Sequence, residues 1–161
     1  MTEVVQERII IRAPAAAVYA AVSDVRRMGE WSPECVGATL DDPGSPLAVG
    51  STFRGHNRQG RWRSWTTRCT VTAAEPGRCF GFDVRLGGTL VSSWRFELTS
   101  APDGAGTEVV QSWWDRRGPA RRRVSALTSG VRDRSRHNRE GMRRTLAALR
   151  ISLESGAPPH R

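Results

Sequence analysis

The chain has 161 residues, of which 38% are hydrophobic and 25% charged. This length and composition predict one soluble domain with a single core. No apolar run approaches the ~18 residues that a membrane-spanning helix needs. Charged residues also interrupt the N-terminal segment where a signal peptide would be apolar, so we expect a cytoplasmic protein.

Charge is distributed unevenly along the chain. The formal net charge is +9, and all 25 basic residues are arginines. Residues 1–115 hold 12 arginines against 13 acids, whereas residues 116–161 hold 13 arginines against 3 acids. The run Arg121, Arg122 and Arg123 therefore predicts a basic surface in the C-terminal quarter. Such a surface can bind the phosphates of a nucleic acid or an anionic membrane, and a solvated helix face is the simpler alternative.

Cysteine and histidine spacing gives no sign of a metal centre. The three cysteines, Cys35, Cys69 and Cys79, show no CxxC spacing, and no two histidines have a spacing typical of metal ligands. Buried, reduced thiols explain this pattern without a disulfide framework. We therefore expect neither a metal nor a cofactor.

The first elements are a strand and two short helices. Residues 3–13 alternate β-branched and polar side chains, which predicts a strand. Residues 14–24 switch to a helical composition with a proline at the tolerated first turn. Residues 25–30 predict a second short helical segment. Pro33 ends it, because proline disfavours helix at the residue before it.

An antiparallel meander is predicted between residues 36 and 114, where β-branched and aromatic runs alternate with short turn signals. One long strand is expected to begin at Trp62. Period-2 alternation predicts inward faces made of Phe80, Phe82, Val84 and Leu86, of Trp94, Phe96 and Leu98, and of Trp65, Thr67, Cys69 and Val71. For residues 107–114 the inward parity stays open, because the adjacent residues Trp113 and Trp114 compete for it.

A long helix is predicted at the C-terminus. Residues 118–130 are basic and have room for one or two helical turns. From about residue 130 to residue 154, apolar and small side chains recur at three- and four-residue steps, which is typical of one helix face. We expect residues 156–161 to be disordered. The polar side chains expected to point inward from the sheet and this helix are Asn57, Gln111, Ser135 and Asn138.

This order of elements predicts an α+β fold, because only the long helix is large enough to cover the apolar face of the sheet. A curved sheet gripping one helix leaves space between them. The order resembles the helix-grip fold of the SRPBCC superfamily, which includes START domains, pollen-allergen-like proteins and polyketide cyclases. The resemblance is carried by the segments RAPAAAVYAAVSD, MGEWSPE, STFRGHNRQGRWRSW, SWRFELTSAPDGAGTEVVQSWW and RHNREGMRRTLAALR.

The resemblance is closest to the polyketide cyclase/dehydrase-like branch and covers nearly all of residues 3–155. It implies a single domain over residues 1–155, with about six or seven antiparallel strands curved around the C-terminal helix and two short helices after the first strand. It also implies a hydrophobic ligand cavity between sheet and helix. It does not imply catalysis, because function has to be argued from the site.

We therefore expect the protein to bind a small hydrophobic ligand, polyketide- or lipid-like, and leave open whether it is an enzyme that catalyses cyclisation or dehydration. The expected cavity wall consists of Trp31, Phe53, Asn57, Trp65, Phe82, Trp94, Asn138 and Met142. Plain core packing of the aromatic residues is the competing explanation. The alternative function is a binding module without chemistry that uses the arginine-rich region on RNA, the ribosome or anionic lipid.

The hexapeptide EWSPEC, residues 30–35, concentrates groups that look reactive. Glu30 and Glu34 are expected to be solvated in a polar turn, where nothing predicts the burial that a catalytic carboxyl needs. Trp31 is expected to border the cavity entrance in this fold. It acts there as a gate over the ligand or, as we favour, as a plug that seals the end of the sheet.

A cysteine–histidine couple is not expected. Cys35 would need a nearby base, and His56 and His137 are the histidines in the folded body. By strand parity His56 faces solvent, and by helical geometry His137 lies about 100° off the inward helix face. We therefore expect Cys35 to pack without chemistry.

Overall fold

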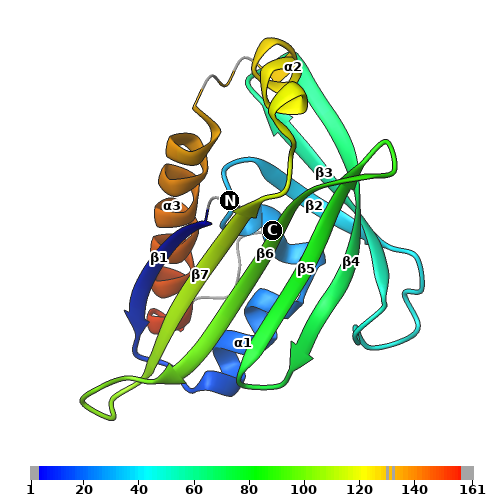
Figure 1. The fold of residues 1–161 in the computed structure, drawn as a ribbon. Helices are drawn as coiled ribbons and strands as arrows, with labels where there is room; N and C mark the ends of the chain where they lie inside the picture. Colours follow the sequence, from blue (N-terminus) through cyan, green and yellow to red (C-terminus); the bar gives the residue numbers. More distant parts are fainter. Residues whose placement is uncertain (1–3, 130, 132, 157–161) are drawn as a thin grey trace.

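Seven strands form one sheet in the order β1-β7-β6-β5-β4-β3-β2, and every neighbouring pair is antiparallel. The sheet curves, and α1 and α3 lie on its concave side (Figure 1). This is the predicted α+β helix-grip architecture. The strands are β1 (Val4–Ile11), β2 (Cys35–Leu40), β3 (Thr52–Gln59), β4 (Arg63–Glu75), β5 (Cys79–Leu86), β6 (Thr89–Ser100) and β7 (Thr107–Asp115).

The computed structural model describes residues 4–129, 131 and 133–156. The disorder predicted for the C-terminal tail falls outside these residues except at Gly156, which is exposed. Among the described residues, no helix has the length and apolar character needed to cross a membrane.

Two short helices follow β1, as predicted: α1 (Ala15–Ser23) and the 3-10 helix η1 (Val25–Glu30). At the other end of the chain, α2 (Pro119–Ser129) has 11 residues, about three turns, and is longer than the one or two turns predicted. The long helix α3 (Arg134–Glu154) begins a few residues later than predicted. Its start is fixed by Asp133, whose side chain accepts a hydrogen bond from the Arg136 N–H at 3.0 Å.

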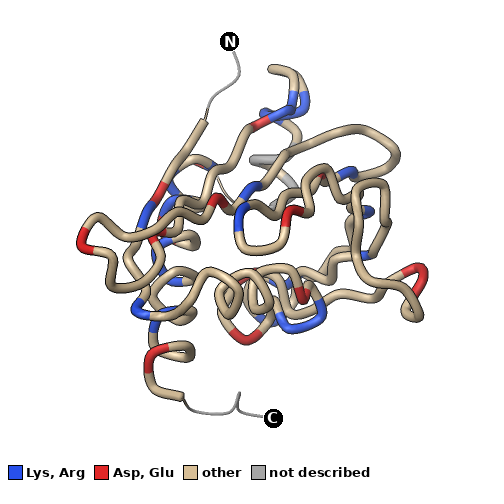
Figure 2. Tube along the Cα trace, turned by 90° about the horizontal axis from the view of Figure 1, so that it is seen from below, with Lys and Arg blue, Asp and Glu red and all other residues tan. Residues whose placement is uncertain are grey.

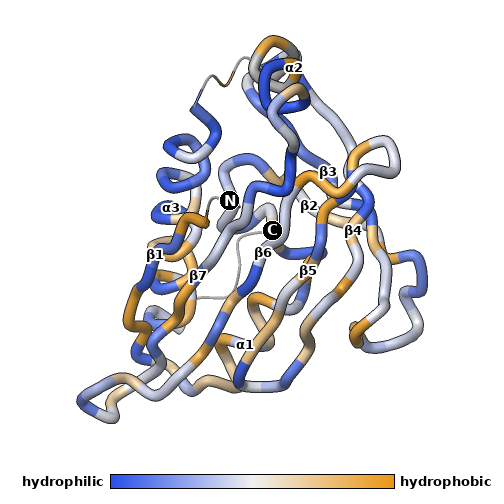
Figure 3. The backbone as a smooth tube through the Cα atoms, in the orientation of Figure 1, coloured by the Kyte–Doolittle hydropathy of each residue, from blue (hydrophilic) through white to orange (hydrophobic). Residues whose placement is uncertain are grey.

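The core fills the end of the concave face that lies under α1. Val18 and Val22 of α1, Phe80 of β5, and Leu146 and Leu149 of α3 are buried in one cluster. The main neighbours of α3 are β1 and α1. Figure 3 shows the same division, because the first half of α3 is hydrophilic while α1 and the strands beside it carry apolar segments.

The strand faces follow the predicted alternation. The structure also decides which side chains of residues 107–114 point inward. In β7 the buried residues facing the core or cavity include Val109, Gln111 and Trp113, so Trp114 points the other way. The prediction for Trp62 was wrong. Trp62 lies in the β3–β4 turn and is 89% exposed, because the chain reverses at Gly60, which has a left-handed φ of 64°, before β4 begins.

Candidate ligand-binding cavity

A cavity of about 640 Å³ lies between the concave face of the sheet, the loop after η1, α2 and the first half of α3. Folded interiors are normally packed without voids larger than a water molecule, so a space of this size is a feature of the fold and not a packing gap. Its volume falls within the range of ordinary small-molecule sites, about 300–1,000 Å³. The aromatic side chains that line it are Trp31, Phe53, Trp62, Trp65, Phe82, Trp94, Phe96 and Trp113.

Alternation along the strands brings these aromatic rings together. Phe53 and Phe82 meet edge to face with 5.5 Å between their ring centroids, and Trp94 and Trp113 lie 6.3 Å apart. Such pairs stabilise the wall beyond the area they bury. Met142 of α3 completes this apolar surface and is 1% exposed. The main body of the cavity is therefore lined by packed aromatic and apolar side chains.

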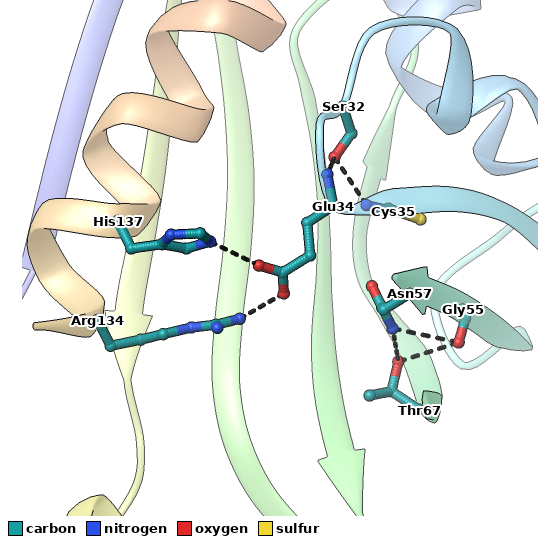
Figure 4. A network of polar contacts seen from close by, with 8 residues as sticks. All are labelled: Ser32, Glu34, Cys35, Gly55, Asn57, Thr67, Arg134 and His137. Carbon is teal, nitrogen blue, oxygen red and sulfur yellow. Dashed lines mark hydrogen bonds and ion pairs between the residues drawn. The ribbon is translucent and has the colours of Figure 1, made fainter. Parts of the chain in front are cut away.

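A few polar groups reach the same space. Asn57 Nδ2 lies 3.4 Å from both Thr67 Oγ1 and the Gly55 carbonyl oxygen, at the long end of hydrogen bonding (Figure 4). Asn138 of α3 is 6% exposed. Gln111 lines the cavity, and its Oε1 atom is buried without a hydrogen-bond partner among the described residues. Weakly satisfied polar groups of this kind can orient a bound molecule.

Glu34 is the main departure from the sequence prediction. It was expected to be solvated, but its side chain is 20% exposed and lines the cavity. Its Oε2 atom lies 2.9 Å from Nε2 of His137, and its Oε1 atom accepts a hydrogen bond from Arg134 (Figure 4). Glu30, by contrast, is exposed, as expected, and pairs with Arg27.

The electrostatics of this cluster favour the ionised carboxylate. Burial by itself would raise the pKa of Glu34, but the His137 hydrogen bond and the charge and hydrogen bond of Arg134 outweigh it and lower the pKa below its ordinary value of 4.5. His137 therefore lines the cavity beside a carboxylate that orients its ring. The prediction that His137 lies off the inward face was wrong, because the cavity-facing stripe of α3 is wider than the apolar pattern indicated.

The sequence contains one signal for this cluster. Arg134 and His137 are three residues apart on α3, and such pairs share one helix face. Glu34 is 103 residues away from His137, so its place beside them follows only from the fold. Ser135, which was expected to point inward, does not line the cavity, whereas Arg134, Gly141 and Thr145 do.

The thiols are not activated. Burial raises the pKa of Cys35, whose Sγ atom lies 3.4 Å from the Gly37 carbonyl oxygen. Burial also raises the pKa of Cys69 to about 11. Both border the cavity, but each stays protonated at neutral pH and is a weak nucleophile. His56 faces away from the cavity, as predicted, with Nε2 2.8 Å from Thr39 Oγ1. Within the described residues, no cluster of three or more histidine, cysteine or acidic side chains could hold a metal.

The structure places all eight predicted wall residues at the cavity. They are Trp31, Phe53, Asn57, Trp65, Phe82, Trp94, Asn138 and Met142. That they contact a ligand stays a prediction. Trp31 is 7% exposed, belongs to the main core cluster and is covered by the Arg27 guanidinium at 5.0 Å from its ring centroid. This burial favours the plug over the gate.

The predicted basic surface is divided among different surroundings. Arg121 and Arg123 are both exposed, but only Arg121 lines the cavity, where it donates to Thr89 Oγ1 at 2.8 Å. Arg122 pairs with Asp115 at 3.2 Å. Figure 2 shows acidic and basic residues interleaved along the trace. Binding of RNA or anionic lipid by this region stays an untested prediction.

A family model described as "Polyketide cyclase / dehydrase and lipid transport" matches residues 1–151. The chain belongs to this family. The match spans both the sheet and most of α3, in agreement with the helix-grip arrangement and the SRPBCC resemblance. No curated protein sequence matches the chain.

Several solved structures are similar over nearly the whole chain. The Polyketide_cyc-like protein of Corynebacterium glutamicum is 32% identical, with a TM-score of 0.63, and the match covers 97% of this chain and 94% of that one. The di-domain ARO/CYC StfQ from the steffimycin biosynthetic pathway is 12% identical, with a TM-score of 0.74, over 97% of this chain and 52% of that one. The di-domain ARO/CYC BexL is 22% identical, with a TM-score of 0.69, over 98% and 51%. These last two likenesses establish the fold alone.

Proposed function

We propose that the protein binds a small, flat hydrophobic molecule, polyketide- or lipid-like, in the cavity between the sheet and α3. The observation that carries this proposal is the aromatic lining of a 640 Å³ space that the chain does not fill. Family membership supports it, since the family description names polyketide cyclases and lipid transport.

Titration with N-phenylnaphthylamine, a neutral dye whose fluorescence rises in apolar surroundings, tests the proposal. We expect saturable binding of one dye per chain and a rise in the melting temperature, because a ligand that binds only the folded state stabilises it. Trp65→Ala removes a wall ring and should weaken binding by about tenfold, which corresponds to roughly 1.4 kcal/mol.

Trp114→Ala is the matched control, since Trp114 is also a strand tryptophan but does not line the cavity. Its dye affinity should equal that of the wild type. Equal losses in Trp65→Ala and Trp114→Ala, or dye binding without saturation, would contradict a specific site. Native mass spectrometry of protein purified from its own host is a separate experiment, which would identify any molecule that co-purifies.

Catalysis of cyclisation or dehydration is a second candidate, favoured by the Glu34–His137 pair in the cavity. Both reactions require a proton to be removed from carbon. A neutral imidazole held by a carboxylate hydrogen bond is a general base of the usual kind. Glu34 fixes the tautomer by accepting from Nε2, which leaves Nδ1 as the acceptor of a proton.

Nitrobenzisoxazole is a probe for such a base, because removal of its ring C–H proton breaks the N–O bond and releases a coloured nitrophenolate bearing a nitrile. If His137 is the base, His137→Gln should lower the rate by about tenfold or more, since a positioned base contributes roughly 10²–10⁴-fold. His56→Gln is the control, because His56 lies outside the cavity. Equal rates in the wild type and His137→Gln would rule out this role.

A further inference from the structure

The cavity lining is electrically unbalanced. Besides its apolar and neutral polar residues, it contains the arginines Arg63, Arg117, Arg121 and Arg134 and one acid, Glu34. Its arginines therefore outnumber its acids by three. A cavity that took only a neutral hydrocarbon would gain nothing from this excess, because each charge costs free energy when a ligand displaces its water.

Ion pairs with Glu34 and Asp115 offset part of the positive charge of these arginines. Arg134 is paired with Glu34, and Arg117 is paired with Asp115 at 2.9 Å. Asp115 serves a second cation as well, since Arg122 lies 3.2 Å from the same carboxylate oxygen. The hydrogen-bond partner of Arg121 is the hydroxyl of Thr89, which carries no charge. Arg121 therefore brings a positive charge to the cavity that its hydrogen bond does not neutralise.

The charged residues lie at one end of the cavity. They come from α2 and the segment before it, from the first turn of α3, from the start of β4 and from the loop before β2. Figure 1 shows α2 and the start of α3 at the same end of the molecule, opposite the end that α1 closes. We call the end lined by Arg63, Arg117, Arg121 and Arg134 the basic mouth. The lining residues from the centres of β3, β5 and β6, among them Phe53, Phe82 and Phe96, are uncharged.

We propose that the ligand is an amphipathic anion: an apolar body that fills the aromatic part of the cavity and one negatively charged group, a carboxylate or phosphate, that binds at the basic mouth beside Arg121. This inference rests on the proposed function and adds the ligand's charge and its orientation. Guanidinium groups form short, strong hydrogen bonds with such oxyanions. Low-dielectric walls around a charged mouth also concentrate anions there.

Two dyes with one skeleton test this proposal. Anilinonaphthalene sulfonate carries a sulfonate group on the same ring system as N-phenylnaphthylamine, which is neutral. We expect the anionic dye to bind about tenfold more tightly, the effect of one charge-assisted hydrogen bond. We also expect this preference to shrink as salt is added, because the mouth is open to solvent and its charges are screened.

Arg121→Gln should remove most of the preference by weakening the sulfonated dye while changing the neutral dye by less than about twofold. Arg121 lies on the exposed helix α2, so the fold should be retained, which circular dichroism checks. Arg123→Gln is the matched control. It removes the same charge from the same helix at an exposed position that does not line the cavity, and it should change neither affinity.

The outcomes separate this inference from the proposed function. Equal affinity of the wild type for both dyes would overturn the anionic ligand and leave a hydrophobic cavity site intact. Equal loss in Arg121→Gln and Arg123→Gln would also overturn it, because the effect would then come from the overall charge of α2. If neither dye binds, both proposals are wrong.

Discussion

The two halves of α3 lie in very different surroundings. In the C-terminal half, Leu146 and Leu149 are 2% and 0% exposed and pack with α1 and the sheet. In the N-terminal half, Arg134 and His137 have side chains 20% and 38% exposed and line a cavity. The packed core and the cavity therefore lie toward opposite ends of the same helix. Substitutions of core residues that do not line the cavity should therefore change stability without changing dye affinity.

The largest effect is expected in the packed end. Phe80 is 0% exposed, meets Tyr19 edge to face and does not line the cavity. Phe80→Ala should lower the free energy of unfolding by about 3–5 kcal/mol, as truncation of a buried phenylalanine does. Urea denaturation measures this loss. The folded fraction should keep its affinity for N-phenylnaphthylamine, and a large loss of affinity would argue against two separate regions.

Trp31 lies at the border, since it belongs to the packed core and also lines the cavity. If it is a plug, Trp31→Ala should lower the free energy of unfolding by about 3 kcal/mol. If it is a gate, the variant should instead release the dye faster with little loss of stability. Urea denaturation and stopped-flow dye release, measured on the same preparation, distinguish the two roles.

The Glu34 cluster tests how much the contacts at the basic mouth contribute to stability. Because the folded-state pKa of Glu34 is lowered, its ion pairs stabilise the fold fully above its ordinary pKa of 4.5, and this stability is lost as pH falls through the folded-state value. Glu34→Gln should lower the free energy of unfolding by about 2 kcal/mol at neutral pH. The difference from the wild type should vanish in acid. A difference independent of pH would contradict the ion pairs.

The smallest expected effect is a gain in stability. Gly141 lies in the middle of α3, and a methyl group there would have Pro33 Cγ as its nearest neighbour at 3.6 Å, an ordinary contact. Gly141→Ala should raise the free energy of unfolding by about 0.5–1 kcal/mol, because glycine lowers helix stability by that amount. Although Gly141 lines the cavity, one added methyl group should change dye affinity by less than about twofold. Thermal denaturation measures the change, and a lower melting temperature for Gly141→Ala would contradict the open space beside Gly141.

Most of the fold could be predicted from local patterns. Alternation along β5 and β6 identified the inward face, and the glycine pair Gly87 and Gly88, with φ of 55° and 79°, marked a hairpin turn. The start of α3 was placed too early, because the apolar pattern extends past the point where Asp133 caps the helix. Parity in β7 could not be predicted, since Trp113 and Trp114 are alike and only pairing with β6 and β1 decides between them.

The apolar part of the site followed from the same strand patterns, but its charged part did not. Arg134 and His137 look like solvent-facing helix residues, and Glu34 looks like a polar loop residue. Each acquires a different environment only when the fold brings the loop before β2 against the first turn of α3. The place of Arg121 at the cavity depends in the same way on how α2 folds over the mouth.

The central claim is that a hydrophobic molecule occupies the cavity, and tryptophan indole N–H signals in a two-dimensional NMR titration with N-phenylnaphthylamine test it most directly. Five of the six tryptophans line the cavity, and Trp114 does not. We expect saturable shifts for Trp31, Trp65, Trp94 and Trp113, with Trp114 unchanged. Shifts of Trp114 as large as those of its neighbour Trp113, or no shift at saturating dye, would contradict it.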